Sequence, residues 1–185
     1  MADTVKEHAT EAVRKLKEMG LKVVMISGDN EKTAKAIAEQ LGIDNYFAEL
    51  SPEDKLKIID ELRREEKHVA MVGDGVNDAP ALAKANVGIA MGAIGSDVAL
   101  ETADIALMHD DLLKLPYLFS LSKRTVKVMK QNIYSSILIK GSLAVLAILG
   151  FVTLWLAVGI GDMGLSLAVI LNAMRLSLIN DKNIG

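Results

Sequence analysis

The chain has 185 residues, which is enough for one domain of ordinary size and a further segment. Its formal net charge of −3 offers no basic field for nucleic acid, and the absence of cysteine excludes disulfides, thiolate catalysis and zinc–cysteine sites in it. Residues 1–131 carry nearly all the charge, whereas 133–179 contain only Lys140, Asp162 and Arg175 as charged groups. This break in composition predicts a polar domain followed by an apolar one.

The polar part alternates between helical and strand periodicity. Apolar residues recur at helical spacing from Val5 to Leu16, and the pattern stops at Gly20. We then expect, in chain order, a strand over 22–26, a helix from Thr33 to Gly42, a short strand over 46–50, a helix starting at Ser51-Pro52, a strand over 68–72, a short helix after Asp78, a strand over 86–90, a helix over 96–102 and a strand over 105–108. Alternating strands and helices predict parallel pairing with right-handed crossovers, which is a doubly wound α/β sheet.

Two polar turns follow expected strands, at the edge of a parallel sheet where ligands bind. The first is Ser27-Gly28-Asp29-Asn30, and the second runs from Gly73 to Asp78. Glycines let the backbone approach a ligand closely, and amides at a following helix start favour an anion. Carboxylates beside a phosphate require a hard cation between them, so the turns predict a site for magnesium and phosphate. The alternative is that these are ordinary turn residues.

Three segments in this order, MISGDN, LSPEDK and MVGDGVNDAPAL, resemble the second part of the phosphorylation domain of P-type ATPases. These pumps are a branch of the haloacid dehalogenase superfamily. The resemblance runs from about Asp3 through the apolar part of the chain. It implies a partial haloacid dehalogenase-like domain over 1–120, a basic linker or helix over 121–132, a transmembrane helical hairpin over 133–179 and a cytoplasmic tail over 180–185.

The resemblance also implies roles for the first turn and for the helix after it. Ser27, Gly28 and Asp29 would form part of the catalytic site. Ser27 stands where the family usually has threonine and keeps the hydroxyl that would hydrogen-bond the phosphoryl group. Lys55 would neutralise charge on the phosphoryl oxygens. The alternative for Lys55 is a solvated lysine on a helix surface.

In the second turn, the resemblance implies that Asp74 and Asp78 bind Mg²⁺ and that Asn77 and Asp78 order the phosphate and metal shell. ATP would be the phosphoryl donor in the complete pump. The family's nucleophile is the aspartate of a DKTGT sequence, which does not occur in these 185 residues. Asp3-Thr4-Val5 is the segment most similar to DKTGT, but it precedes a predicted helix instead of ending a strand.

We therefore expect the C-terminal portion of a pump, which does not hydrolyse ATP without the missing N-terminal part. Two alternatives remain. One is a non-catalytic membrane subunit of a split pump, and the other is a haloacid dehalogenase-like phosphatase.

Residues 133–150 and 154–179 form two apolar runs, each close to the ~20 residues that span a bilayer as a helix. Buried helices of a soluble protein are the alternative. Basic residues flank both runs: Lys123, Arg124, Lys127 and Lys130 before the first, and Arg175 and Lys182 at the end of the second. These flanks predict an integral protein of the cell membrane, with the α/β domain and the C-terminus in the cytoplasm.

Two opposite charges lie within the apolar runs. Lys140 is 12 residues before Val152 and Asp162 is 10 residues after it, so a turn at Val152 places them at similar depth. Neither the Tyr-Asn nor the Met-x-x-Ser-Ser pattern of the family's copper pumps is intact, whereas Lys140 and Asp162-Met163-Gly164 resemble the zinc, cadmium and lead exporters. This resemblance implies that Asp162 binds the transported divalent ion and that Lys140 is its counter-charge. A structural ion pair is the alternative.

Overall fold

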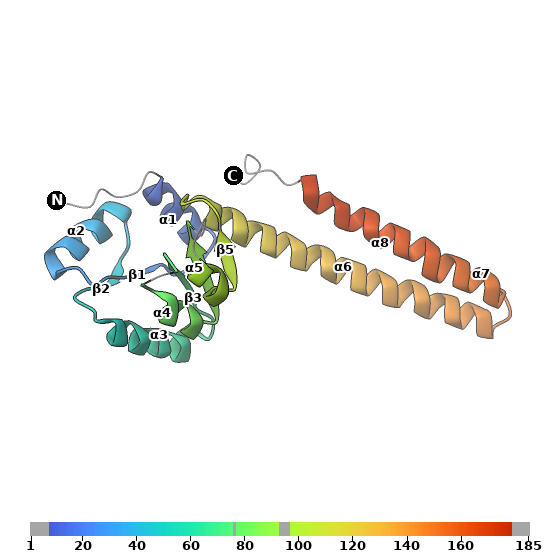
Figure 1. Cartoon of the computed structure of the whole chain (residues 1–185). Helices are drawn as coiled ribbons and strands as arrows, with labels where there is room; N and C mark the ends of the chain where they lie inside the picture. The colour runs from blue at the N-terminus through green and yellow to red at the C-terminus, as the bar shows by residue number, and fades with distance from the viewer. Residues whose placement is uncertain (1–7, 76, 93–96, 179–185) are drawn as a thin grey trace. The chain divides into compact units, whose positions relative to one another are not determined.

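The computed structural model describes residues 8–75, 77–92 and 97–178, and the chain divides into two compact units, Met1–Pro116 and Tyr117–Gly185 (Figure 1). The predicted helix start at Val5, the first residue of the helix over 96–102 and the tail over 180–185 lie outside the described residues. The elements of the N-terminal unit are α1 (Ala9–Glu18), β1 (Val24–Ile26), α2 (Glu31–Leu41), β2 (Asn45–Phe47), α3 (Pro52–Glu66), β3 (Ala70–Gly73), α4 (Ala79–Lys84), β4 (Val87–Met91), α5 (Asp97–Thr102) and β5 (Ile105–Leu107). They follow the predicted order.

Local side-chain chemistry sets the ends of the longer helices. The side chain of Asn30 accepts a hydrogen bond from the backbone N–H of Thr33, which caps the start of α2, and the helix ends at Gly42 with φ 70°. The hydroxyl of Ser51 accepts from the backbone N–H of Asp54 and caps α3. The predicted start of α3 and the predicted end of α2 are therefore confirmed.

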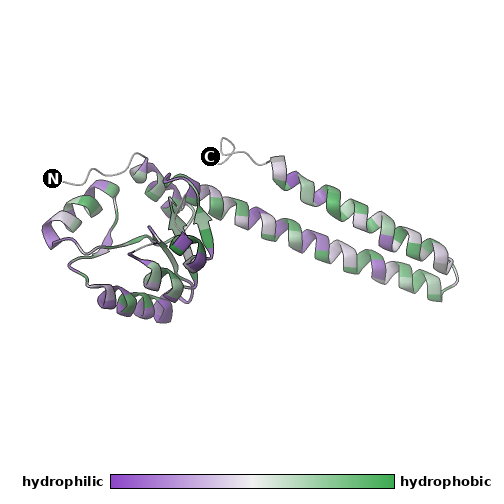
Figure 2. Ribbon diagram, in the orientation of Figure 1, coloured by the Kyte–Doolittle hydropathy of each residue, from purple (hydrophilic) through white to green (hydrophobic). Residues whose placement is uncertain are grey.

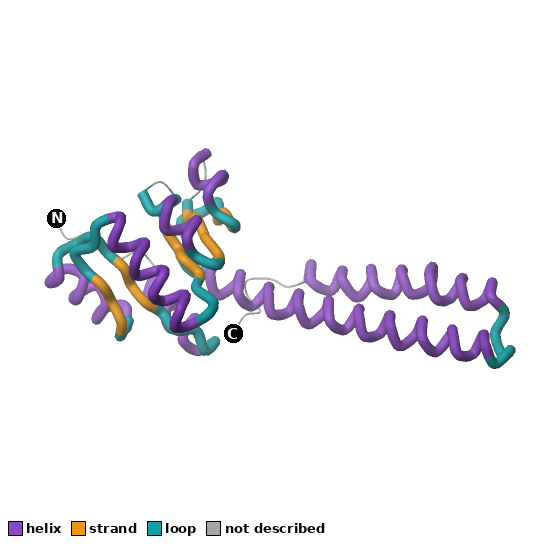
Figure 3. The backbone as a smooth tube through the Cα atoms, turned by 90° about the horizontal axis from the view of Figure 1, so that it is seen from below, coloured by secondary structure: helices purple, strands orange, loops and turns teal. Residues whose placement is uncertain are grey.

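The strands pair in parallel, as predicted, but the described strands form two separate ladders instead of one sheet. One ladder is β1-β2, and the other is β3-β4-β5; Figure 3 shows these strands in orange. A strand joins a sheet only where a neighbouring backbone offers aligned N–H and C=O groups. Among the described residues, β1 and β3 each have such a neighbour on one edge only.

The core of this unit joins the helices to the three-stranded ladder. Its buried members are Ile59 of α3, Met71 of β3, Ala81 and Leu82 of α4, Ala90 of β4 and Ala99 of α5. Ile26 of β1 packs against the same cluster, although β1 is not hydrogen-bonded to β3. The carboxyl ends of β1 and β3, from which both polar turns start, thus belong to one packed unit.

The C-terminal unit is a helical hairpin. Its elements are α6 (Lys114–Ile148), which begins at the end of the N-terminal unit, α7 (Leu154–Val158), the π-helix η1 (Gly159–Gly164), α8 (Leu165–Met174) and the 3₁₀-helix η2 (Arg175–Leu178). The two arms lie side by side in Figures 1 and 3. The segment predicted as a linker or helix over 121–132 is part of α6.

Both arms are long and apolar enough to cross a membrane, over Lys114–Ile148 and Gly159–Ser177. Figure 2 shows the apolar residues along them. None of the apolar window of the first arm and only 11% of that of the second is buried. A core helix of a soluble protein would be covered on all sides, so this exposure favours membrane helices.

Candidate functional site

The first polar turn is held against the end of the β1-β2 ladder. The backbone N–H of Ser27 donates to the carbonyl of Phe47 at 2.9 Å, and the Ser27 carbonyl accepts from the N–H of Leu50 at 3.1 Å. The hydroxyl of Ser27 donates to the carboxylate of Asp29 at 2.7 Å and accepts from the Asp29 backbone N–H at 3.1 Å. A Cβ at Gly28 would lie 3.3 Å from the Leu50 carbonyl oxygen. The turn is therefore tight, and the Ser27 hydroxyl is oriented at the carboxyl end of β1.

The second turn closes on the carboxylate of Asp74. This carboxylate accepts hydrogen bonds from the backbone N–H of Asn77 at 3.0 Å and from its side-chain amide at 3.1 Å. Gly75 has φ 78°, and a Cβ there would lie 2.4 Å from the Cβ of Ala99. Only glycine fits this position, because both the backbone angle and the packing against α5 exclude a side chain.

Lys55 and Asp78 connect α3 to the second turn. The Nζ atom of Lys55 donates to Oδ1 of Asp78 at 2.7 Å, and the two side chains are 21% and 18% exposed. The solvated-lysine alternative for Lys55 does not fit this paired and mostly buried position. A Cβ at Gly73 would lie 2.8 Å from the Cβ of Asp78, so the glycine leaves room for the carboxylate.

The carboxylates of the second turn fit a hard cation, because Mg²⁺ takes one or two carboxylates together with phosphate and water oxygens. Among the described residues no group of three or more His, Cys, Asp or Glu side chains gathers. Asp74 is exposed and accepts from Asn77, whereas Asp78 is mostly buried and accepts from Lys55. The Asp74 carboxylate is therefore the more accessible of the two to a cation that arrives from solvent.

A second candidate site lies in the hairpin. Nζ of Lys140 donates to Oδ1 of Asp162 at 2.9 Å, which confirms the predicted apposition of the two charges. Asp162 belongs to the π-helix η1, where three glycines surround it in the sequence Gly159-Ile160-Gly161-Asp162-Met163-Gly164. Such wider turns occur often at functional sites.

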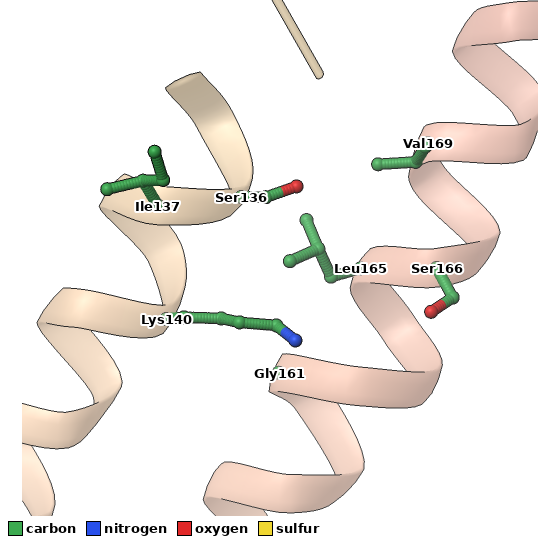
Figure 4. A pocket seen from close by; sticks show the side chains of 7 residues that line it. All are labelled: Ser136, Ile137, Lys140, Gly161, Leu165, Ser166 and Val169. Carbon is green, nitrogen blue, oxygen red and sulfur yellow. The ribbon is translucent and has the colours of Figure 1, made fainter. Parts of the chain in front are cut away.

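A groove with a volume of about 530 Å³ adjoins this ion pair (Figure 4). Its lining residues are Ser136, Ile137, Lys140, Gly161, Leu165, Ser166 and Val169. Figure 4 shows the Lys140 side chain reaching from its helix toward the opposite arm at Gly161. The groove therefore offers one ammonium and two hydroxyls within an otherwise apolar hairpin.

Sequence reasoning missed a second polar contact between the two arms. The side-chain amide of Asn172 donates to Oδ1 of Asn132 at 2.7 Å, and Arg175 donates to Oδ1 of Asn172 at 3.2 Å. The available signal was the presence of an uncharged amide in each membrane-length helix, which a search for charged groups alone overlooks.

The fold and the two turns define the class of the N-terminal unit. Residues 1–86 match the family model of haloacid dehalogenase-like hydrolases. The chain thus combines a haloacid dehalogenase-like α/β domain with two helices of membrane-spanning length.

Similar proteins give a closer assignment. The chain is 51% identical over 182 residues, 98% of its length, to a probable cadmium-transporting ATPase of Alkalihalophilus pseudofirmus. It is 45% identical over 176 residues, 95% of its length, to a copper-exporting P-type ATPase of Staphylococcus aureus. A crystal structure of a zinc-transporting PIB-type ATPase in the E2.Pi state matches 94% of the chain with a TM-score of 0.86 and 45% identity.

The chain spans about a quarter of the length of the curated relatives it matches, 25% of the cadmium-transporting protein and 22% of the copper-exporting one. It covers 28% of the zinc-transporting chain. The chain is therefore a homologue of a C-terminal part of heavy-metal P-type ATPases, and the resemblance predicted from its motifs is confirmed. Its relatives and its two apolar helices indicate a membrane protein.

Proposed function

We propose that this chain is the C-terminal part of an ATP-driven exporter of divalent heavy-metal ions, with zinc, cadmium and lead as the cargo class. The observation that carries the proposal is the Lys140–Asp162 ion pair between two helices of membrane-spanning length. The chain's relatives, which include a probable cadmium-transporting ATPase and a zinc-transporting ATPase, support it. A carboxylate oxygen suits a divalent ion better than copper(I), which prefers thioether and thiolate sulfur.

In this proposal Asp162 binds the transported ion, and Lys140 takes the place of the ion when it leaves. The present contact of 2.9 Å supports an exchange of one cation for the other at the same carboxylate. A charge left alone inside the bilayer costs at least ~2.5–3.5 kcal/mol on insertion scales. The ammonium would therefore keep the site neutral between transport cycles. A purely structural ion pair is the competing role.

The N-terminal unit supplies one part of the phosphorylation site. Bound Mg²⁺ would neutralise charge on the phosphoryl group, and the Asp74 carboxylate would hold the ion. The hydroxyl of Ser27 would donate to a phosphoryl oxygen, and the ammonium of Lys55 would stabilise negative charge there. Asn77 orients the Asp74 carboxylate and Asp78 orients Lys55, as their hydrogen bonds of 3.1 Å and 2.7 Å support.

The phosphoryl acceptor comes from the missing N-terminal part of the pump, because these 185 residues contain no DKTGT sequence. The edges of the two ladders support this arrangement. A parallel strand inserted between β1 and β3 would join both ladders into one sheet and would end between the two polar turns. An aspartate at the end of that strand would face Ser27 on one side and Asp74 on the other.

The chain is integral to the cell membrane in this proposal, with the α/β domain and the C-terminus in the cytoplasm. Basic residues at both ends of the hairpin support this orientation, since cytoplasmic flanks carry an excess of Lys and Arg.

A chimeric pump tests the transport site. In it, these 185 residues replace the matched C-terminal part of the cadmium-transporting relative. Asp162→Asn should abolish high-affinity zinc binding, whereas Lys140→Ala should retain binding and slow release. Ser142→Ala is a matched control, because the Ser142 hydroxyl donates to a carbonyl of its own helix, that of Ile139 at 2.9 Å. Zinc binding by Asp162→Asn as tight as that of the parent would make the carboxylate structural.

A further inference from the structure

We propose that the hydrogen bond between Asn132 and Asn172 sets the register of the hairpin and so determines that Lys140 meets Asp162. The two asparagines act as positioning residues and do not touch the reacting groups. The register itself is independent of the proposed function. Its consequence for metal binding rests on the proposed role of Asp162.

The first observation is a regular seam between the two arms. Over residues 132–147 of α6, the less exposed residues recur at intervals of three and four. They are Asn132, Ser136, Ile139, Leu143 and Ala147. The same spacing recurs on the opposite arm at Gly161, Leu165, Val169, Asn172 and Leu176. This pattern resembles the buried face of a coiled coil, in which a single polar pair in an apolar seam specifies register.

The amide pair is geometrically demanding. Asn172 donates to Asn132 at 2.7 Å through short side chains. Arginine has no acceptor, so the 3.2 Å contact from Arg175 turns Oδ1 of Asn172 toward the guanidinium and leaves its amide nitrogen to reach Asn132. A slip of the arms by one helical turn moves the residues ~5.4 Å apart and breaks the bond.

The ion pair tolerates such a slip more easily. The side chains of Lys140 and Asp162 are 57% and 62% exposed, and the lysine has a flexible four-carbon stem. An ammonium on that stem can follow a carboxylate through several angstroms. Hence the ion pair alone selects the register weakly.

A second contact shows that one register holds along the seam. A Cβ at Gly161 would lie 3.2 Å from Cδ1 of Leu143. Leu143 lies eleven residues after Asn132, and Gly161 lies eleven residues before Asn172. Lys140 and Asp162 lie between these two matched contacts, so fixing the amide pair fixes their apposition.

Disulfide trapping measures the register directly, because the chain contains no cysteine of its own. The full 185-residue chain is reconstituted in phosphatidylcholine vesicles without metal. Leu143→Cys with Gly161→Cys reports the observed register, and Ala147→Cys with Gly161→Cys reports a slip of one turn. In the parent the first pair should oxidise at least about tenfold faster than the second, as expected if one register is strongly preferred.

Replacing both asparagines by leucine removes the bond without leaving an unpaired amide, so the hairpin should stay helical. In Asn132→Leu/Asn172→Leu the preference should fall to about twofold or less. Asn172→Asp should retain the preference, because its oxygens can accept from both Arg175 and Asn132. Lys140→Met/Asp162→Asn should also retain it.

An undiminished preference in the leucine variant, with helical content shown by circular dichroism, would overturn the proposal. Loss of the preference in the variant without the two charges would do the same, because the ion pair would then set the register. Asn172→Asp gives an independent test, because a loss of the preference as large as that in the leucine variant would also overturn the proposal. Failure of Asp162 to bind zinc would refute the proposed function and leave the trapping ratios unchanged.

Discussion

Replacing Gly73 with alanine should separate Asp78 from Lys55 and weaken the start of α4. The new Cβ would lie 2.8 Å from the Cβ and 2.9 Å from Oδ2 of Asp78. Non-bonded carbon atoms prefer ~3.5–4.0 Å, so the Asp78 side chain must move by about 1 Å. That shift would lengthen its 2.7 Å hydrogen bond from Lys55 beyond useful range.

The magnitude follows from the burial of the pair. A hydrogen bond to a charged group contributes ~1.5–3 kcal/mol, and the remaining exposure of 21% and 18% reduces this to about 1–2 kcal/mol. The backbone N–H of Leu82, which donates to the Asp78 carbonyl at 2.8 Å, reports the loss. Its hydrogen exchange should accelerate about 5–30-fold in Gly73→Ala.

Gly141→Ala provides the control, because a Cβ at Gly141 meets nothing within 4 Å. Exchange at Leu82 should not change in that variant. If Leu82 exchanges at the parent rate in Gly73→Ala as well, the close packing of Gly73 against Asp78 does not hold the turn, and the reasoning is wrong.

Two further predictions concern the N-terminal unit. Ile59 is 1% exposed in the core, so Ile59→Ala should lower the free energy of unfolding of this unit by ~2–5 kcal/mol. Hydrogen exchange of core amides in denaturant measures this loss, and a loss well below the range would contradict the assignment of Ile59 to the core. Hydrogen bonds from Lys57 and from Ser51 lower the pKa of Asp54 in the folded state. The charged carboxylate therefore stabilises the folded state at a pH above the pKa of Asp54 in the unfolded chain, and this contribution is lost as the pH falls through the lower pKa of the folded state. In a ¹³C NMR titration, Lys57→Ala should raise the Asp54 midpoint, and an unchanged midpoint would exclude the lysine as the cause.

Local chemistry made the helix ends predictable. Ser51 followed by Pro52 specifies a helix start, and Gly42 specifies a helix end, through contacts within a few residues. The order of the strands followed from short apolar runs, with boundaries within a few residues of those found. The division into two ladders was not predictable in the same way. A strand's own residues show that it is extended but not which neighbour its second edge meets.

In the hairpin, too, the features fixed by local helix geometry were predictable, whereas those that depend on packing between the two arms were not. Counting from the turn near Val152 placed Lys140 and Asp162 at similar depth, because a helix has a fixed rise per residue, and the structure shows them in contact. The π-helix around Asp162 and the Asn132–Asn172 bond depend on how the two arms pack, and helical periodicity alone does not reveal them.

In the N-terminal unit the resemblance assigned Lys55 to the phosphoryl group and Asp78 to the metal shell. The structure shows that the two side chains contact each other directly. Motifs predict which residues serve a site, whereas the contacts among those residues follow from the fold.

The most direct test of the central claim is the formation of an acid-stable phosphoenzyme from ATP labelled at its γ-phosphate. The purified chain alone should take up no label, because it contains no DKTGT sequence. When the chain is mixed with the upstream part of the cadmium-transporting relative, label should appear on that upstream part only. Label on an aspartate of this chain, or phosphatase turnover by the chain alone, would contradict its assignment as the C-terminal part of a pump.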